Sequence, residues 1–171
     1  LVSAGVNPRI SVTEDSGPQT VLSLAIQVSA GLADESSQTL NFVIDSNSNP
    51  ALFLAGPAVS ATGTLTFTTA SNASGSADIV LHLHDNGGTT NGGVADSAAQ
   101  TFTITVNAVN DAPVASSGTL TTNEDTTATG VLSATDIDNG SLTYSLMDTI
   151  NVHGTVTITN AATGAYSYIP E

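Results

Sequence analysis

The chain of 171 residues contains no cysteine, no tryptophan and no lysine, and Arg9 is its one arginine. Without cysteine, neither disulfide bonds nor thiolate zinc sites can form. Proteins that bind nucleic acid or an anionic membrane surface do so through several lysine and arginine side chains. We therefore expect no nucleic-acid partner and no direct membrane binding.

Positive charge is scarce, but negative charge is abundant. Fifteen aspartate and glutamate residues give the chain a formal net charge of -14. Such an imbalance favours solubility and adds self-repulsion. Divalent cations such as Ca2+ prefer carboxylate and carbonyl oxygens as ligands. Acidic side chains that converge in the fold would therefore favour a bound cation.

Apolar residues at helical spacing are missing, and aromatic residues make up only 4% of the chain. Hydrophobic residues nevertheless reach 40%, which argues against a disordered chain. Short stretches of alternating apolar and polar residues, separated by turn residues, predict an all-β sandwich. The predicted strands of the first part are Arg9–Val12, Thr20–Val28, Leu40–Ile44, Ala51–Leu54, Thr64–Thr68, Asp78–His84 and Gln100–Val106.

Motifs from the first part of the chain recur in the second part in the same order. The matched pairs are Glu14-Asp15 with Glu124-Asp125, Gln38–Phe42 with Gly140–Tyr144, and Ala61–Phe67 with Ala162–Tyr168. Similar motifs at nearly equal spacing predict a tandem array of one module. We assign residues 1–110 and 111–171 to two modules. The joint between them, Asn107–Val114, contains Pro113, which restricts the backbone of the joint.

The second module is expected to be incomplete. Few residues follow Gly164, whereas the first module continues from the matching Gly63 to Asn110. The counterparts of the strands Asp78–His84 and Gln100–Val106 would be missing, which would expose sheet edges and core. We expect this module to be loosely held, or to be completed by strand exchange in a homodimer.

The order of these motifs resembles a cadherin-type repeat. The segments that carry the likeness are Asn110–Pro113, Asn123–Asp125, Leu132–Tyr144 with its Asp136-Ile-Asp138, Ala33–Leu40 and Asp85–Gly93. The whole chain resembles the bacterial cadherin-like and VCBS repeats that occur in tandem arrays of large surface and secreted adhesins. This resemblance implies tandem Ig-like or cadherin-like β-sandwich modules, the second one truncated, and an extracellular or cell-surface location.

Cadherin-type repeats bind calcium between successive domains, and the resemblance implies a set of interdomain ligands here. The implied ligands are Glu14, Asn110, Asp111, Asp136 and Asp138. Ala108 stands where the cadherin joint has an aspartate, and Thr68–Asn72 lacks the Asp-Arg-Glu motif. We therefore expect fewer ions than a vertebrate cadherin joint holds. The alternative, that these acids are solvated turn residues, stays open.

A second acidic group is predicted at the opposite pole of the first module, where it would face a preceding domain. Its members are Asp34, Glu35, Asp85 and Asp96. Here the interpretation as turn residues is favoured over calcium ligation, because half of the ligand cage would come from elsewhere.

Few other residues could bind a metal or take part in catalysis. His82 and His84 alternate on one predicted strand and share a face; two imidazoles can contribute to a zinc site only with a third ligand. An exposed sheet face is favoured for both. No Gly-x-Ser-x-Gly motif occurs, and the paired carboxylates lie in turns. We expect no enzyme.

The expected function is a calcium-binding structural and adhesive repeat of an exported bacterial adhesin, in which Ca2+ stiffens the joint. Its expected partners are neighbouring repeats of the same chain and a cell-surface protein or glycan. Two alternatives stay open: an extracellular module that binds a carbohydrate or protein ligand, and a metal-free spacer.

Overall fold

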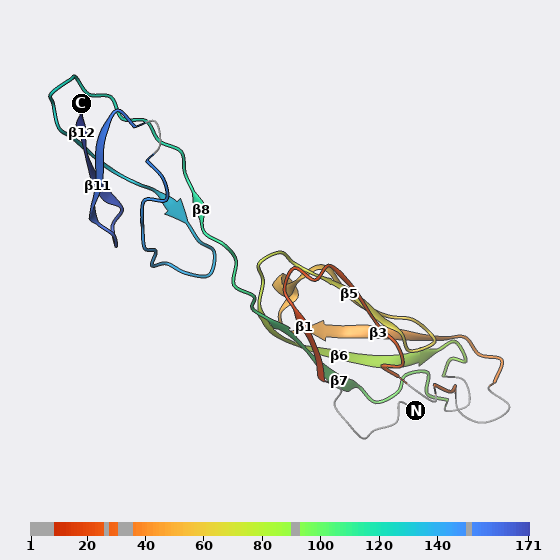
Figure 1. The fold of residues 1–171 in the computed structure, drawn as a ribbon. Helices are drawn as coiled ribbons and strands as arrows, with labels where there is room; N and C mark the ends of the chain where they lie inside the picture. Colours follow the sequence, from red (N-terminus) through yellow and green to blue (C-terminus); the bar gives the residue numbers. More distant parts are fainter. Residues whose placement is uncertain (1–8, 26–27, 31–35, 90–92, 150–151) are drawn as a thin grey trace. The chain divides into compact units, whose positions relative to one another are not determined.

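The computed structural model describes residues 9–25, 28–30, 36–89, 93–149 and 152–171. The chain divides into two compact units, unit 1 (Leu1–Val109) and unit 2 (Asn110–Glu171). Both units consist of β-strands and loops, and no α-helix occurs in the described ranges (Figure 1). The prediction of an all-β fold is confirmed.

Unit 1 contains a four-stranded sheet in the order β1-β7-β6-β3. The strands are β1 (Arg9–Thr13), β7 (Gln100–Asn107), β6 (Gly75–Asp85) and β3 (Leu40–Asn47). β6 pairs antiparallel with both β7 and β3, whereas β1 runs parallel to β7. The first and last strands of the unit therefore lie side by side.

A second sheet of unit 1 has the order β2-β5-β4 and is antiparallel throughout. The strands are β2 (Pro18–Val21), β5 (Leu65–Thr69) and β4 (Phe53–Val59). A 3-10 turn, η2 (Pro50–Leu52), leads into β4. Proline suits the start of such a turn because its φ is already fixed and its missing N–H has no partner to lose.

One hydrophobic core joins the two sheets of unit 1. Alternate residues of β6, β7 and β5 point inward, as the two-residue period of a strand dictates. The buried members of this core are Ile10, Leu52, Leu65, Phe67, Ala77, Ile79, Leu81, Phe102, Ile104 and Val106. Phe53 and Phe67 meet edge to face with ring centroids 5.7 Å apart, an arrangement that adds to the stabilisation from burial. Burial of these side chains is the main stabilising contribution to the sandwich.

Unit 2 contains a three-stranded antiparallel sheet in the order β11-β12-β9 and a short pairing of β8 with β10. The bounds are β8 (Val114–Ala115), β9 (Ala128–Val131), β10 (Ala134–Thr135), β11 (Gly154–Asn160) and β12 (Ala165–Pro170). Residues 116–127 and 136–149 carry no strand.

The sheet of unit 2 repeats the second sheet of unit 1. In both, a central strand preceded by a left-handed glycine pairs with an early strand on one side and a hairpin partner on the other. Gly63 precedes β5 with φ +82°, and Gly164 precedes β12 with φ +73°. Asp15 and Asp125, which belong to the recurring Glu-Asp pair, share φ values of 56° and 58°. The sequence repeat thus corresponds to a repeat in backbone conformation.

Two of the predicted strands are wrong in part. β2 ends at Val21, and the predicted strand is replaced over residues 22–25 by a turn in which Ser23 has φ +59°. Ile26 and Gln27 of the predicted strand lie outside the described residues. A hydrogen bond of 3.3 Å from the Ala25 N–H to the Gly63 carbonyl oxygen stabilises the turn. A long-range contact therefore overrides the alternation that favoured a strand.

The predicted strand Ala51–Leu54 also differs, because Pro50–Leu52 forms η2 and the strand begins only at Phe53. β3 in turn runs beyond the predicted break, to Asn47, because its register with β6 shifts between Ile44 and Ser46. The bulge absorbs one residue and lets the strand continue. The other predicted strands agree with the structure within a few residues.

Candidate functional site

A turn after β10 gathers acidic residues around backbone N–H groups. Asp136 Oδ1 accepts hydrogen bonds from the N–H of Asp138 at 2.9 Å and from the N–H of Asn139 at 2.8 Å. An aspartate that accepts backbone bonds from the residues that follow it is a common way to close a turn. The turn fixes Asp136 and Asp138 relative to each other.

The first residues of unit 2 lie against this turn. The Asp111 N–H donates to Asp138 Oδ2 at 2.5 Å, and Asn139 Nδ2 donates to Asn110 Oδ1 at 3.2 Å. Four of the five ligands implied by the resemblance, Asn110, Asp111, Asp136 and Asp138, therefore belong to one network within unit 2. Asn139, which is not among the implied ligands, has a side chain that links the two segments.

The donor set of this network is chemically suited to a hard cation. It offers carboxylate oxygens and an amide oxygen, the ligand types of calcium sites. Within the ranges that the structure describes, however, no three His, Cys, Asp or Glu side chains are placed together as a group that could hold a metal ion. Two of the carboxylate oxygens accept backbone N–H groups instead. Calcium ligation by these residues therefore stays a prediction.

The fifth implied ligand, Glu14, lies in unit 1 at the end of β1. Its side chain is buried, with 5% of the residue exposed. Glu14 Oε1 accepts a hydrogen bond from the Val109 N–H at 2.7 Å, and the Glu14 N–H donates to the Asn107 carbonyl oxygen at 3.0 Å. Both bonds tie the segment after β7 back to the end of β1. The implied role as a calcium ligand stays a prediction.

We expect Glu14→Ala to destabilise unit 1 by about 1–3 kcal/mol, because the Val109 N–H loses its acceptor. Glu14→Gln should cost less, since the amide oxygen can still accept the bond. Urea unfolding followed by circular dichroism measures the difference. The recurring residue Glu124 is exposed, so Glu124→Ala is the matched control and should change stability by about 0.5 kcal/mol or less. Equal losses for Glu14→Ala and Glu124→Ala would contradict the anchoring role.

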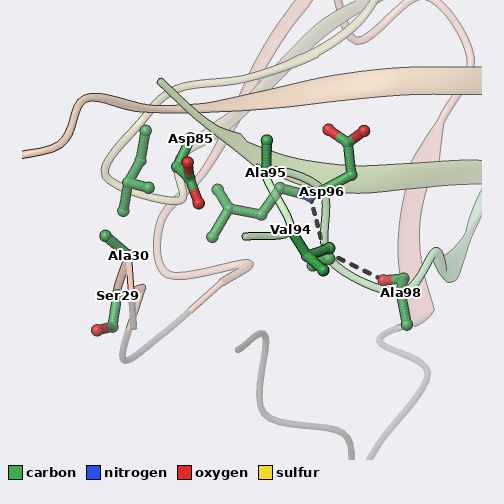
Figure 2. A pocket seen from close by; sticks show the side chains of 10 residues that line it. Ser29, Ala30, Asp85, Val94, Ala95, Asp96 and Ala98 are labelled. Atoms are coloured by element: carbon green, nitrogen blue, oxygen red, sulfur yellow. Dashed lines mark hydrogen bonds between the residues drawn. The ribbon is translucent and has the colours of Figure 1, made fainter. Parts of the chain in front are cut away.

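The structure describes two of the four residues of the second predicted acidic group. Asp34 and Glu35 lie outside the described residues. Asp85 and Asp96 both line a hollow of about 260 Å3 at one end of unit 1. Figure 2 shows them on either side of Ala95, with carboxylates that do not point toward each other. Asp85 Oδ1 accepts the Gly87 N–H at 2.8 Å, as the interpretation as a turn residue implies.

Asp96 interacts instead with the histidines of β6. Asp96 Oδ1 lies 2.6 Å from His84 Nδ1 and 3.4 Å from His82 Nε2. The hydrogen bond from His84 lowers the pKa of Asp96 below its ordinary value of 3.8, against a smaller opposing effect of burial. Because the folded-state pKa is lowered, this contribution to stability is complete above pH 3.8 and is lost as the pH falls through the lowered value.

His82 has a second partner that sequence analysis missed. His82 Nδ1 lies 2.8 Å from Asp45 Oδ1. Asp45 sits at the bulge of β3, two residues after Val43, which pairs with His82. Alternation alone would place Asp45 and Val43 on the same face of β3. It does not reveal that Asp45 contacts His82, because that contact depends on the bulge in β3. Both histidines are half-buried on the outer side of β6, opposite its core-facing residues Leu81 and Leu83.

The described residues contain no helix that is long and apolar enough to cross a membrane. No curated protein matches the chain. Among solved structures, murine CEACAM1b is similar at 14% sequence identity over 96% of this chain and 81% of that chain, with a TM-score of 0.27. At this TM-score the similarity supports no conclusion about the fold or the function of this chain. Residues 110–171, which make up unit 2, match the family model of the bacterial Ig domain, so this part of the chain is similar to a bacterial Ig-like repeat.

Proposed function

We propose that the chain is a non-catalytic structural repeat of an exported, adhesin-type bacterial protein, and that it binds Ca2+ through Asn110, Asp111, Asp136 and Asp138. The similarity of unit 2 to a bacterial Ig domain supports the repeat. The hydrogen bond between Asp111 and Asp138 supports the cation site, because it brings two carboxylate-bearing segments together.

The proposed site has a mechanical role. Asn110 and Asp111 are the first residues of unit 2, and Pro113 follows them. A cation shared by these residues and the Asp136–Asn139 turn would neutralise clustered negative charge and fix the segment that follows Val109. Without the cation, repulsion between the carboxylates would loosen that segment. The proposed partners are neighbouring repeats of the same chain and a cell-surface protein or glycan.

Calcium titration of the full chain, first freed of metal with EGTA, tests the site. We expect a Kd of about 10⁻⁴–10⁻³ M, the range of extracellular calcium modules. At a calcium concentration ten times Kd, preferential binding to the folded state should stabilise unit 2 by about 1.4 kcal/mol. All three tyrosines, Tyr144, Tyr166 and Tyr168, belong to unit 2, so tyrosine fluorescence follows its unfolding separately.

The double variant Asp136→Asn with Asp138→Asn should abolish the calcium-dependent stabilisation. Glu124→Gln, which removes one negative charge elsewhere in unit 2, is the matched control and should keep it. Small-angle scattering in EGTA and in calcium adds a readout of the joint. Absence of binding heat together with unchanged tyrosine melting would reject the cation site and leave a metal-free spacer.

A further inference from the structure

Three asparagines of the chain are followed directly by glycine: Asn86, Asn91 and Asn139. Before glycine, the side-chain amide carbon of asparagine is open to attack by the next backbone nitrogen, because glycine has no Cβ to hinder the approach. Asn91 lies outside the described residues. Asn86 and Asn139 are each preceded by aspartate as well, so the structure allows a comparison of two sites with the same local sequence.

Both reacting groups of the Asn86-Gly87 site are held by hydrogen bonds. Asn86 Oδ1 accepts a bond from the Thr39 N–H at 2.8 Å, and the Gly87 N–H donates to Asp85 Oδ1 at 2.8 Å. The glycine nitrogen must lose its proton before it attacks, and a carboxylate in contact with that N–H opposes the negative charge that would form. The fold therefore protects Asn86 from cyclisation.

The Asn139-Gly140 site, in the turn after β10, is not held in this way. Both residues are exposed. Asn139 Nδ2 donates to Asn110 Oδ1 at 3.2 Å, which engages the nitrogen that would leave and not the nitrogen that would attack. Among the described residues, no hydrogen bond engages Asn139 Oδ1 or the Gly140 N–H. The fold therefore leaves this second site reactive.

We propose that Asn139 is a site of spontaneous modification, at which Gly140 converts the side-chain amide into a carboxylate. The Gly140 nitrogen loses its proton and bonds to Asn139 Cγ, the bond from Cγ to Nδ2 breaks, and ammonia leaves with that proton. Water then opens the cyclic imide. Cleavage of one C–N bond of the imide gives aspartate and cleavage of the other gives isoaspartate, so the net reaction replaces NH2 by OH without an oxidant or a reductant.

The modification changes the hydrogen-bond network at the first residues of unit 2. Asn139 Nδ2 donates to Asn110 Oδ1, whereas a carboxylate in its place has no donor and would face that oxygen with another acceptor. The new charge also enters the turn that carries Asp136 and Asp138, whose carboxylates would repel it. We expect the modified turn to hold the segment at Asn110 and Asp111 less firmly when no cation is bound.

The same change would strengthen the cation site, and this consequence rests on the proposed function. Calcium affinity depends on the number of charged ligands. A carboxylate at position 139 adds an anionic ligand beside Asp136 and Asp138, where the unmodified chain offers only a neutral amide. The modification would thus replace a contact maintained by hydrogen bonds with one maintained by calcium.

The test follows the full chain during incubation at mildly alkaline pH. Cleavage before aspartate then releases residues 85–95 and 138–147, and fragmentation in the mass spectrometer locates the replacement of NH2 by OH. A new cut before residue 139 marks the aspartate product. In the folded chain we expect Asn139 to react at least about tenfold faster than Asn86, whereas in guanidinium chloride, where the fold protects neither site, the two rates should agree within about twofold.

Gly140→Ala is the matched control. A Cβ at Gly140 meets nothing within 4 Å, and the residue has no positive φ. The variant should therefore fold like the parent chain, while its methyl group hinders the attack. We expect the rate at Asn139 to fall at least about tenfold and the rate at Asn86 to stay unchanged.

Asn139→Asp places the product side chain in every molecule. In EGTA we expect it to lower the melting temperature of unit 2, measured by tyrosine fluorescence. In calcium it should lower the Kd about tenfold relative to the parent chain. Asn139→Ala, which removes the donor without adding a charge, should not bind calcium more tightly than the parent chain.

Equal rates at Asn139 and Asn86 in the folded chain would overturn the proposal, and so would an undiminished rate in Gly140→Ala. Unchanged melting of Asn139→Asp in EGTA would overturn the effect on the network. Absence of calcium binding by both the parent chain and Asn139→Asp would reject the proposed cation site alone, because the difference in rate between Asn139 and Asn86 is measured without calcium.

Discussion

Replacing Ile104 with alanine is expected to lower the free energy of unfolding of unit 1 by about 2–5 kcal/mol. Ile104 lies at the middle of β7, is fully buried, and pairs with Ile10 of β1 on one side and Ala77 of β6 on the other. The deletion leaves a cavity where both sheets meet. Such a cavity costs more than transfer of the lost groups, because a close-packed interior collapses only partly around it.

Urea unfolding followed by far-UV circular dichroism measures this loss, since tyrosine fluorescence reports only unit 2. Leu54→Ala in β4 is the matched control, because Leu54 is 81% exposed. It should change the free energy of unfolding by about 0.5 kcal/mol or less. Similar midpoints for Ile104→Ala and Leu54→Ala would show that the core is not where we place it.

Gly63→Ala is expected to destabilise unit 1 by more than the roughly 1–2 kcal/mol that a left-handed backbone costs a residue with a Cβ. Gly63 has φ +82°, and a Cβ there would lie 2.2 Å from the Ala25 carbonyl oxygen. That oxygen is part of the backbone, so it cannot move away without breaking the bond from the Ala25 N–H to the Gly63 carbonyl oxygen. Strain and steric clash therefore add together.

Two other glycines separate these contributions. Gly17 has φ +70° with open space around its Cβ position, so Gly17→Ala should show the backbone strain alone. Gly56 has open space and no positive φ, so Gly56→Ala should be nearly neutral. Thermal melts of the three variants by circular dichroism give the ranking. If Gly63→Ala melts together with Gly17→Ala, the clash with Ala25 is relieved by a local movement.

How far the sequence alone predicts this molecule depends on whether a pattern is local. Alternation identified β5, β6 and β7 because each has a core face and a solvent face. It failed after Val21 and before Phe53, where a contact to Gly63 and the conformation of Pro50 decide the backbone. The recurring motifs coincide with two three-stranded sheets of similar order, and the repeated glycine has a left-handed backbone in both.

In the candidate site, too, local motifs were predictable from the sequence and long-range contacts were not. The resemblance implied Asn110, Asp111, Asp136 and Asp138 as ligands, and the structure places all four in one hydrogen-bond network. The contact between Glu14 and Val109 joins residues far apart in sequence, so no local pattern could indicate it. The pairing of His82 with Asp45 depends on a bulge that alternation does not encode.

The parallel pairing of β1 with β7 also determines how unit 1 would bear tension. Five residue pairs join the two strands, from Arg9 with Thr103 to Thr13 with Asn107. A force that enters before Arg9 and leaves after Asn107 pulls parallel neighbours in opposite directions along their axes. All the bonds between them are then sheared together instead of being peeled apart one after another, which is the more resistant geometry for a segment stretched end to end.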